Sequence, residues 1–382
     1  YFSNFMKIAI VGGGPAGLYL GYLLKRDHSG HSVDIFEQNP QGNTWGFGVV
    51  FSDRALDFLN IDDPETYQRL IPKMEHWVDL KLDLLGEQII LDGIGFASIG
   101  RLQLLEILSE RLASVGIIPK SSTPLKDLSC FHDYDLVVGA DGLNSVVRQQ
   151  PGFHSETRLL SNFFAWYGTK KPFDTLTQSF RNSPWGPFNA HHYRYSKEMS
   201  TFIIETDRET WERSGFSKIT DQERIKACET IFADVLEGEP LVQNRSTWRQ
   251  FPVIQCENWF HENMVLIGDA LHTAHFSIGS GTRLALEDSL ALSKAIRIHG
   301  TDLQSALKTF EKERKPVLSK LVDASLQSAK WYENFGEHMN LPAWEFAESY
   351  LARAGRIDEE RMKTISPKFM AGLLQYRKNI SI

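Results

Sequence analysis

KIAIVGGGPAGLYL (residues 7–20) places a short apolar, β-rich run directly before a glycine turn and a helix-forming segment. Gly12, Gly14 and Gly17 form a GxGxxG pattern, which allows a tight turn and a close approach of the backbone to a pyrophosphate at the helix N-terminus. Glu37 ends the next β-rich run, twenty residues after Gly17, where a carboxylate can bind ribose hydroxyls. This pattern predicts a βαβ unit that binds a dinucleotide with an unphosphorylated ribose, FAD or NAD rather than NADP.

The composition is that of an ordinary globular protein. The chain has 382 residues, enough for two domains or for one domain with a large insertion. Its formal net charge is −7 and it has no basic block, which argues against nucleic acid as a partner. Cys130, Cys228 and Cys256 lie far apart and fit no disulfide or metal spacing, as expected in a reducing cytoplasm.

The N-terminal apolar run resembles a signal peptide, but it is interpreted here as part of the fold. Three consecutive glycines and a proline interrupt it, and no small-residue cleavage site follows. It is too short and too rich in glycine for a membrane span, and no other apolar segment is longer. We therefore expect a cytoplasmic protein without a membrane span, and YFSNF (1–5) is interpreted as a tag remnant.

The sequence pattern changes along the chain. Residues 7–150 alternate β-rich runs with helical periodicity, including a helix over 101–112. Between about 160 and 255, β-branched and aromatic runs separated by turn residues predict a mostly antiparallel sheet. The parallel pattern returns at MVLIGD (264–269), and helical sequence continues from 283 almost to the end. We expect a nucleotide-binding α/β domain interrupted by a sheet domain.

Two further stretches have both a structural and a chemical interpretation. DLVVGADG (135–142) ends a buried strand in Asp141 and Gly142, which taken alone is a strand, a turn and a capped helix start. GDALHTAHFSIGSGTRLALED (268–288) places Asp269 after another buried strand. That carboxylate is either a helix or turn cap, or an acceptor for hydroxyl hydrogens of a sugar chain, with backbone N–H groups beyond it facing an electron-rich ring.

The three motifs in this order resemble those of the single-component FAD-dependent aromatic hydroxylases, the family that includes p-hydroxybenzoate hydroxylase. The resemblance extends over about residues 6–330. It implies a Rossmann-like FAD-binding domain, an inserted antiparallel substrate sheet and C-terminal helices. It also implies hydroxylation of an electron-rich aromatic ring with O₂ through a flavin C4a-hydroperoxide, with NAD(P)H as a transient co-substrate.

The resemblance also implies which residues contact the cofactor. Asp269 is expected to bind the ribityl chain, residues 279–283 to run under the isoalloxazine ring, and Arg101 to contact the flavin from a helix start. A helix N-terminus there would stabilise the negative charge of reduced flavin. The expected FAD-binding residues are Gly12, Gly14, Pro15, Ala16, Gly17, Glu37, Gln38, Arg101, Asp141, Asp269, Gly279, Ser280, Gly281, Thr282 and Arg283.

Departures from the usual family pattern point to a narrower group. Most members have paired prolines after the GD motif, where this chain has His275 and Phe276. HFSIGSGT (275–282) and WGFGVVFSD (45–53) resemble a group that contains salicylyl-CoA 5-hydroxylase, 2-aminobenzoyl-CoA monooxygenase and the tryptophan hydroxylase of violacein biosynthesis. The segment AWYGTKKPFD and the overall length favour the last of these, so an indole or tryptophan-type substrate is expected first.

An aryl-CoA thioester is the alternative substrate. It would need cations for its phosphates, for which Lys170, Lys171 and Arg194 are candidates, although solvated side chains are their ordinary interpretation. A flavin-dependent oxidase or reductase that does not hydroxylate is a weaker alternative. A halogenase is weaker still, because the chain lacks the WxWxIP segment.

The same resemblance divides the chain into segments. The FAD-binding domain is expected over 6–75, 101–160 and 256–330, the substrate domain over 76–100 and 161–255, and C-terminal helices over 331–382. No metal site is expected, because His272 and His275 lack an acidic or cysteine partner at ligand spacing. His191 and His192 alternate faces in a β-rich run, so at most one can face a pocket. No catalytic side chain and no oligomeric state are assigned.

Overall fold

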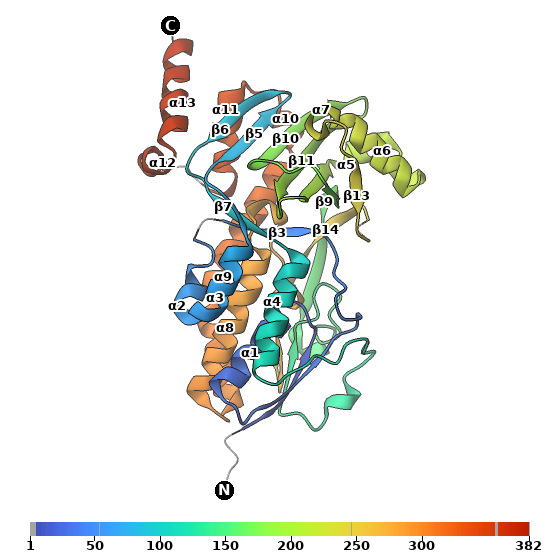
Figure 1. The fold of residues 1–382 in the computed structure, drawn as a ribbon, viewed down its shortest axis with the longest axis vertical. Helices are drawn as coiled ribbons and strands as arrows, with labels where there is room; N and C mark the ends of the chain where they lie inside the picture. Colours follow the sequence, from blue (N-terminus) through green and yellow to red (C-terminus); the bar gives the residue numbers. More distant parts are fainter. Residues whose placement is uncertain (1–4, 53, 246, 356–357, 382) are drawn as a thin grey trace.

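The computed structural model describes residues 5–52, 54–245, 247–355 and 358–381, so residues 1–4 of YFSNF and Asp53 of WGFGVVFSD lie outside the described residues. Figure 1 shows an elongated molecule with two layered parts. The part near the N-terminus contains the nucleotide-binding sheet, and the part near the C-terminus contains a second, larger sheet. No described helix is long and apolar enough to cross a membrane.

The nucleotide-binding sheet has the strand order β15-β16-β8-β1-β2. Four of its strands pair in parallel, namely β1 (Lys7–Val11), β2 (Ser32–Phe36), β8 (Leu136–Gly139) and β16 (Met264–Leu266). β15 (Phe260–His261) adds an antiparallel edge. Parallel strands need a crossover, and α1 (Pro15–Asp27) supplies the first one, directly after the glycine turn. The predicted Rossmann-like architecture is confirmed.

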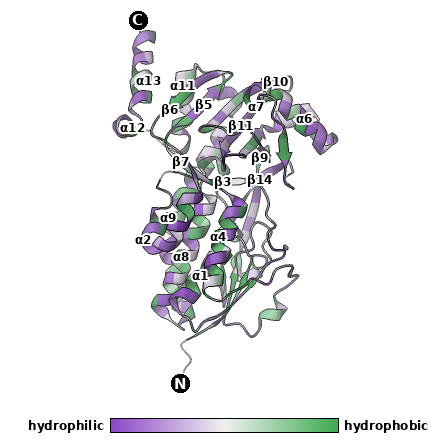
Figure 2. Ribbon diagram, viewed as in Figure 1, coloured by the Kyte–Doolittle hydropathy of each residue, from purple (hydrophilic) through white to green (hydrophobic). Residues whose placement is uncertain are grey.

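Helices pack on this sheet, and together they enclose a hydrophobic core. α1, α4 (Arg101–Ser114), α8 (Gly281–His299) and α9 (Leu303–Glu333) mix hydrophobic and hydrophilic residues along their length (Figure 2). Their apolar residues join the central strands in one buried cluster. Each large side chain buried there contributes about 1.5–3 kcal/mol relative to an exposed one.

The second sheet is mostly antiparallel, and its strands come from two segments of the chain, one before β8 and one between β8 and β16. Its strands are β5 (Leu80–Leu84), β6 (Glu87–Leu91), β9 (Ser155–Thr169), β10 (Leu176–Ser183), β11 (Gly186–Arg194), β12 (Ser200–Thr206), β13 (Leu241–Gln243) and β14 (Arg249–Cys256). Only the β5–β10 pair is parallel among these described strands. One face packs on α5 (Arg208–Ser214), α6 (Asp221–Ile231) and α7 (Ala233–Leu236).

The other face of this sheet packs on the C-terminal helices. The end of α9, α10 (Phe335–His338), α11 (Ala343–Leu351) and α13 (Pro367–Ile380) share an apolar cluster with β5, β6 and β10, and α12 (Glu359–Ile365) precedes α13. A small sheet of β3 (Gly48–Ser52), β7 (Phe96–Gly100) and β4 (Glu75–Trp77) lies between the two parts, and α2 (Asp57–Asp62) and α3 (Pro64–Leu70) connect β3 to β4.

Some elements differ from the sequence-based expectation. β9 runs without a break through residues 160 and 161, because it pairs with β14 over one part and with β12 over the other. α9 likewise continues through residue 330. The alternating stretch near 77–91 is a hairpin, which turns at Leu85 (φ 52°) and Gly86 (φ 94°). Composition changes do not mark boundaries within one continuous strand or helix.

Candidate active site

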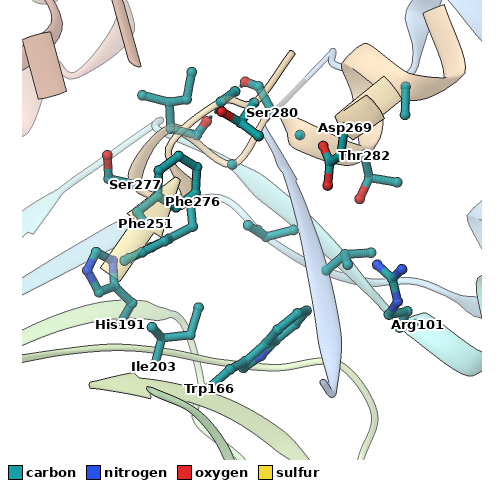
Figure 3. A pocket seen from close by; sticks show the side chains of 18 of the residues that line it. Arg101, Trp166, His191, Ile203, Phe251, Asp269, Phe276, Ser277, Ser280 and Thr282 are labelled. Atoms are coloured by element: carbon teal, nitrogen blue, oxygen red, sulfur yellow. Dashed lines mark hydrogen bonds between the residues drawn. The ribbon is translucent and has the colours of Figure 1, made fainter. Parts of the chain in front are cut away.

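A cavity of about 320 Å³ lies where the carboxyl ends of β1, β8 and β16 meet the inserted sheet (Figure 3). In α/β folds this edge of a parallel sheet is where ligands bind. The cavity is continuous from the glycine turn, through the loop after β16 and the start of α8, to the inner face of the inserted sheet. Nine of the expected residues line it: Gly14, Pro15, Ala16, Arg101, Asp269, Gly279, Ser280, Gly281 and Thr282.

The glycine turn leaves open space in front of α1. Gly12 has φ +111°, and a Cβ there would lie 2.1 Å from the carbonyl oxygen of Ala140. A Cβ on Gly14, in contrast, would meet nothing within 4 Å. Gly14 is also the N-cap of α1, and no side chain caps that end. The first N–H groups of α1 are therefore available to an anion in the cavity.

A second helix N-terminus faces the same cavity. α8 begins at Gly281, and Ser280 precedes it without a side-chain cap. Gly279 (φ +61°) lets the chain turn closely past Val50, whose Cγ1 would lie 3.1 Å from a Cβ at residue 279. The cavity thus offers hydrogen-bond donors at two separate places, which fits a long ligand with a pyrophosphate near α1 and an electron-rich ring near α8.

Asp269 and Arg101 bring opposite charges to the wall between these two helix ends. The Asp269 side chain lines the cavity and is exposed to it (Figure 3). Burial raises the pKa of Asp269, whereas His272 and Arg101 lower it. Burial lowers the pKa of Arg101, and its Nε donates to Thr44 Oγ1 at 2.9 Å. The carboxylate can accept hydrogen bonds from ligand hydroxyls, and the guanidinium can donate to ligand oxygens.

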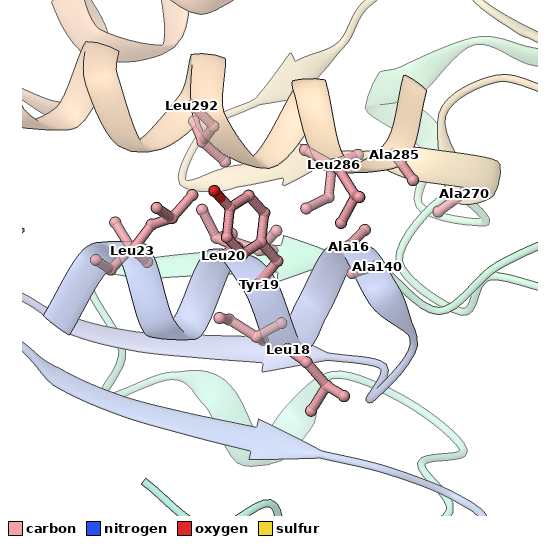
Figure 4. Packing of buried hydrophobic residues seen from close by; sticks show 14 of the residues in the cluster. Ala16, Leu18, Tyr19, Leu20, Leu23, Ala140, Ala270, Ala285, Leu286 and Leu292 are labelled. Atoms are coloured by element: carbon pink, nitrogen blue, oxygen red, sulfur yellow. The ribbon is translucent and has the colours of Figure 1, made fainter. Parts of the chain in front are cut away.

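The two helix ends are held in place by direct packing. In Figure 4, Ala16 of α1 lies against Ala285 and Leu286 of α8. Ser289 Oγ donates to the Ala16 carbonyl at 2.8 Å, which links the third turn of α8 to the start of α1. Small residues at the contact permit this close approach, so the positions of both N–H clusters are set by one helix pair.

The remaining expected residues do not line the cavity. Gly12 and Gly17 shape the turn, and Gln38 is exposed. Glu37 accepts from the Gly13 N–H at 2.7 Å and from the Asn39 N–H at 2.7 Å. Asp141 accepts from the Val146 N–H at 2.7 Å and from Ser145, and Arg283 donates to Glu287 at 2.9 Å. Asp141 therefore caps a turn, but residues 142–149, where the sequence pattern indicated a helix start, form turns instead of a helix. Arg283 lies along its own helix.

The inner half of the cavity is formed by residues outside the expected cofactor-binding set, although the sequence pattern indicated that either His191 or His192 could face a pocket. Its apolar wall is Phe164, Trp166, Leu176, Tyr193, Ile203, Phe251 and Phe276, and its polar residues include Gln178, His191, Ser277 and Arg353. The sequence signal that could have identified such residues is the alternation of side chains between the two faces of a strand. His191 lines the cavity, whereas His192 contacts Ser179 and the rings of Phe173 and Phe202 on the opposite face.

A connected polar cluster lies behind this wall. His275 Nδ1 is 2.7 Å from Ser277 Oγ, which is 2.7 Å from Ser328 Oγ. Arg353 Nε donates to Ser328 Oγ at 3.1 Å, and its Nη2 donates to the Ser277 carbonyl at 3.2 Å. Within the described residues, Arg353 has no carboxylate within 4.0 Å, and no group of three His, Cys, Asp or Glu side chains could hold a metal ion.

Comparisons with known proteins agree with this geometry. The family described as FAD binding domain matches residues 129–325, and the NAD(P)-binding Rossmann-like domain matches residues 10–44. Salicyloyl-CoA 5-hydroxylase of a Streptomyces species is 36% identical over 91% of this chain and 70% of its own length. The chain belongs to the FAD-binding family of aromatic monooxygenases.

Two other relatives of this monooxygenase family match over nearly their full length. 3-Hydroxy-4-methyl-anthranilyl-[aryl-carrier protein] 5-monooxygenase of Streptosporangium sibiricum is 31% identical over 94% of this chain and 97% of its own. Protodeoxyviolaceinate monooxygenase of Chromobacterium violaceum is 32% identical over 91% and 94%. The fold also matches a crystal structure of 2-methyl-3-hydroxypyridine-5-carboxylic acid oxygenase, with TM-score 0.73, 16% identity, and 94% and 98% coverage.

The family membership settles the general chemistry. The chain is an aromatic monooxygenase that uses FAD and NAD(P)H, as the sequence predicted. The two uncapped helix ends and Asp269 are the residues present that fit FAD.

Proposed function

We propose that this monooxygenase hydroxylates the ring of an aroyl thioester, carried by CoA or by a carrier protein. The observation that carries the proposal is Arg353, a cation on the wall of the aromatic-lined inner half. Its described partners are Ser328 Oγ, the Ser277 carbonyl, and the carbonyl and ring of Tyr350, and none of them is a carboxylate. Its Nη1 and Nη2 donate only to backbone carbonyls, so further N–H donors remain for a ligand. A carbonyl oxygen attached to the substrate ring suits this position.

The relatives support the thioester form of that carbonyl. Two of the three described above are named for aroyl groups bound to CoA or to an aryl-carrier protein. The overall length favoured an indole-type substrate from the sequence, but the chain covers 97% of the carrier-protein enzyme's length. Length therefore does not separate the two substrate classes.

The cations first considered for the CoA phosphates are poor candidates. Lys171 forms an ion pair with Glu237, and Arg194 Nε lies 2.9 Å from Glu75 Oε2. None of the three candidates, Lys170, Lys171 and Arg194, lines the cavity. Arg249 does line it and is exposed, with its guanidinium carbon 5.4 Å from the centre of the Phe164 ring. We therefore propose Arg249 as the cation nearest to the carrier arm.

The surrounding residues favour productive hydroxylation. When bound, FAD supplies the activated oxygen atom, using NAD(P)H and O₂. The expected roles of the chain are to hold the aromatic ring beside α8 and to exclude water, which otherwise promotes release of peroxide. Phe251 and Phe276 pack with ring centroids 6.1 Å apart, and Phe164 lies 4.8 Å from Phe276. These rings form a dry wall at the inner end.

An indole-type substrate is the second candidate. The 32% identity to protodeoxyviolaceinate monooxygenase supports it, and Trp166 and Phe276 can pack on an indole as well as on a benzene ring.

The test is NAD(P)H oxidation by FAD-loaded protein with three matched panels: aroyl-CoA esters, aroyl groups on a carrier protein, and free indole or tryptophan compounds. Hydroxylated product and peroxide are both quantified. We expect coupled hydroxylation with a thioester panel, and hydroxylation only of free indoles would select the second candidate. NAD(P)H oxidation that yields only peroxide with all three would overturn both.

A further inference from the structure

Two buried ionisable side chains face each other beside the inner half of the cavity. His191 on β11 is 5% exposed and lines the cavity, and Glu205 on the neighbouring strand β12 is 2% exposed. His191 Nε2 lies 3.4 Å from Glu205 Oε2. Neither of these two buried atoms has a hydrogen-bond partner in the described residues. A small rotation of either side chain would bring them to hydrogen-bonding distance.

The other carboxylate oxygen of Glu205 is already held. Asn162 Nδ2 donates to Oε1 at 2.9 Å and also to the Tyr332 carbonyl at 2.8 Å. His275 Nε2 lies 3.9 Å from the same oxygen. Asn162 therefore fixes the orientation of the carboxyl group and leaves Oε2 for His191.

Burial affects the two groups in opposite directions. It raises the pKa of Glu205 and lowers the pKa of His191 to about 3. Burial therefore disfavours the charged form of each side chain, the imidazolium of His191 and the carboxylate of Glu205. A proton taken up at His191 Nδ1 while the Nε2 proton moves to Glu205 leaves both side chains neutral, which burial favours.

We propose that His191 accepts the proton of a ring hydroxyl group of the substrate at Nδ1, while Glu205 holds the Nε2–H and takes up that proton. The substrate O–H bond breaks, its electron pair stays on the oxygen, and N–H and O–H bonds form on His191 and Glu205. The negative charge moves from Glu205 to the substrate, whose ring becomes richer in electrons for attack on the oxygen atom supplied. The overall reaction is ArH + O₂ + NAD(P)H + H⁺ giving ArOH + NAD(P)⁺ + H₂O.

This inference rests on the proposed function and narrows it, because it names a hydroxyarene ring as the substrate class. His191 is then a catalytic residue. Glu205 is a positioning residue, which selects the tautomer of His191 and receives the relayed proton.

The first test is independent of any substrate. In FAD-loaded protein labelled with ¹⁵N-histidine, the His191 signals are assigned by their loss in His191→Gln, and His192→Gln serves as the matched control on the opposite face of β11. We expect His191 to carry its proton on Nε2 in the wild type, and Glu205→Gln to shift this tautomer. A wild-type His191 protonated on Nδ1, or a tautomer unchanged by Glu205→Gln, would overturn the proposal.

The second test compares salicyloyl-CoA with its O-methyl ether, which has no ring hydroxyl proton. His191→Gln is expected to lower kcat for salicyloyl-CoA on the order of 100-fold and to lower kcat for the ether much less. In His192→Gln, kcat should change by the same factor for both substrates. Equal losses for both substrates, or full activity in His191→Gln, would overturn the role. A wild-type enzyme that hydroxylates only rings without a hydroxyl would overturn it too, while aromatic hydroxylation would stand. A wild type that hydroxylates neither thioester would overturn the proposed function, and the histidine signals would still report on the pair.

Discussion

His272 Nε2 lies 2.6 Å from Oδ2 of Asp288, and the Asp288 side chain is completely buried. The same oxygen accepts the Gly268 N–H at 2.9 Å, and the other oxygen accepts from Arg314 Nε at 2.8 Å. One carboxylate on α8 thus connects α9 to the loop that carries Asp269. The orientation of the cofactor-facing acid depends on a residue that does not line the cavity.

Replacement of this carboxylate should destabilise the fold. Asp288→Asn is expected to lower the free energy of unfolding by about 3 kcal/mol, because Arg314 and His272 lose a buried charged partner. Thermal and urea unfolding measure the loss. Glu311→Gln is the control, since it breaks only the partly exposed Glu311–Lys315 pair within α9, and an effect as large as that of Asp288→Asn would contradict the prediction.

The same carboxylate should make stability depend on acid. Its hydrogen bonds to His272 and Arg314 hold the pKa of Asp288 below its ordinary value in the folded state. The stabilisation is therefore fully present above the unfolded-state pKa of about 4, and it is lost as pH falls through the lower folded-state value. Urea unfolding from pH 7 to 3 should show the difference between wild type and Asp288→Asn narrowing below about pH 4. A difference that stays constant through this range would refute the assignment.

Two effects of an alanine at residue 12 can be measured separately: the steric contact of its Cβ with Ala140, and the strain of a positive φ. Gly12→Ala combines a positive φ with a Cβ 2.1 Å from the Ala140 carbonyl, whereas Gly42→Ala has φ +80° and open space. Gly42→Ala should cost about 1–2 kcal/mol. Gly12→Ala should lower Tm considerably more and abolish FAD retention. Similar Tm losses in both variants would show that the contact with Ala140 is unimportant.

Asp269 should contribute to cofactor affinity. Asp269→Ala removes the acceptor between α1 and α8, and a hydrogen bond to a charged group is worth about 1.5–3 kcal/mol, or about 10- to 100-fold in Kd. Quenching of FAD fluorescence on titration with apoprotein measures this Kd. Asp174→Ala, at a fully exposed carboxylate, is the control. An unchanged Kd for Asp269→Ala would remove it from the site.

Arg353 should act on substrate rather than on cofactor. Arg353→Gln is expected to raise KM for the aroyl substrate about tenfold or more, since one charge-assisted hydrogen bond is lost. FAD affinity and NAD(P)H oxidation without substrate should stay near wild type. Steady-state kinetics with product analysis tests this, and an unchanged KM would exclude contact between Arg353 and the acyl group.

The nucleotide half of the site was predictable from sequence because its signals are local. Gly12 and Asp269 lie just after the ends of buried strands, and Gly17 lies in the first turn of the helix that follows Gly12. These positions can be recognised from the neighbouring residues alone. The inner half was not predictable in this way. His191 and Glu205 approach each other through the register of β11 against β12, in which His191 pairs with Ile203.

Long-range placement also separates the expected residues that line the cavity from those that do not. Glu37 and Arg283 lie at the positions in the sequence where the family contacts FAD. In the structure, however, Glu37 accepts a hydrogen bond from the Gly13 N–H, and Arg283 donates one to Glu287. Arg353 reaches the cavity from η7 (Ala352–Ala354), far from any motif. Single-sequence periodicity carries no information on such contacts.

The long helix α9 makes one contact beside the cofactor loop and another behind the substrate wall. Arg314 on it holds Asp288 below the cofactor loop, and Ser328 on it bonds to Ser277 and Arg353 below the substrate wall. Their spacing is fourteen residues, close to four full turns and about 21 Å along the axis. Adding or deleting one residue between them would rotate one contact by about 100° relative to the other. Loops and pocket walls can therefore change without disturbing these two contacts, whereas the number of residues between Arg314 and Ser328 is geometrically constrained.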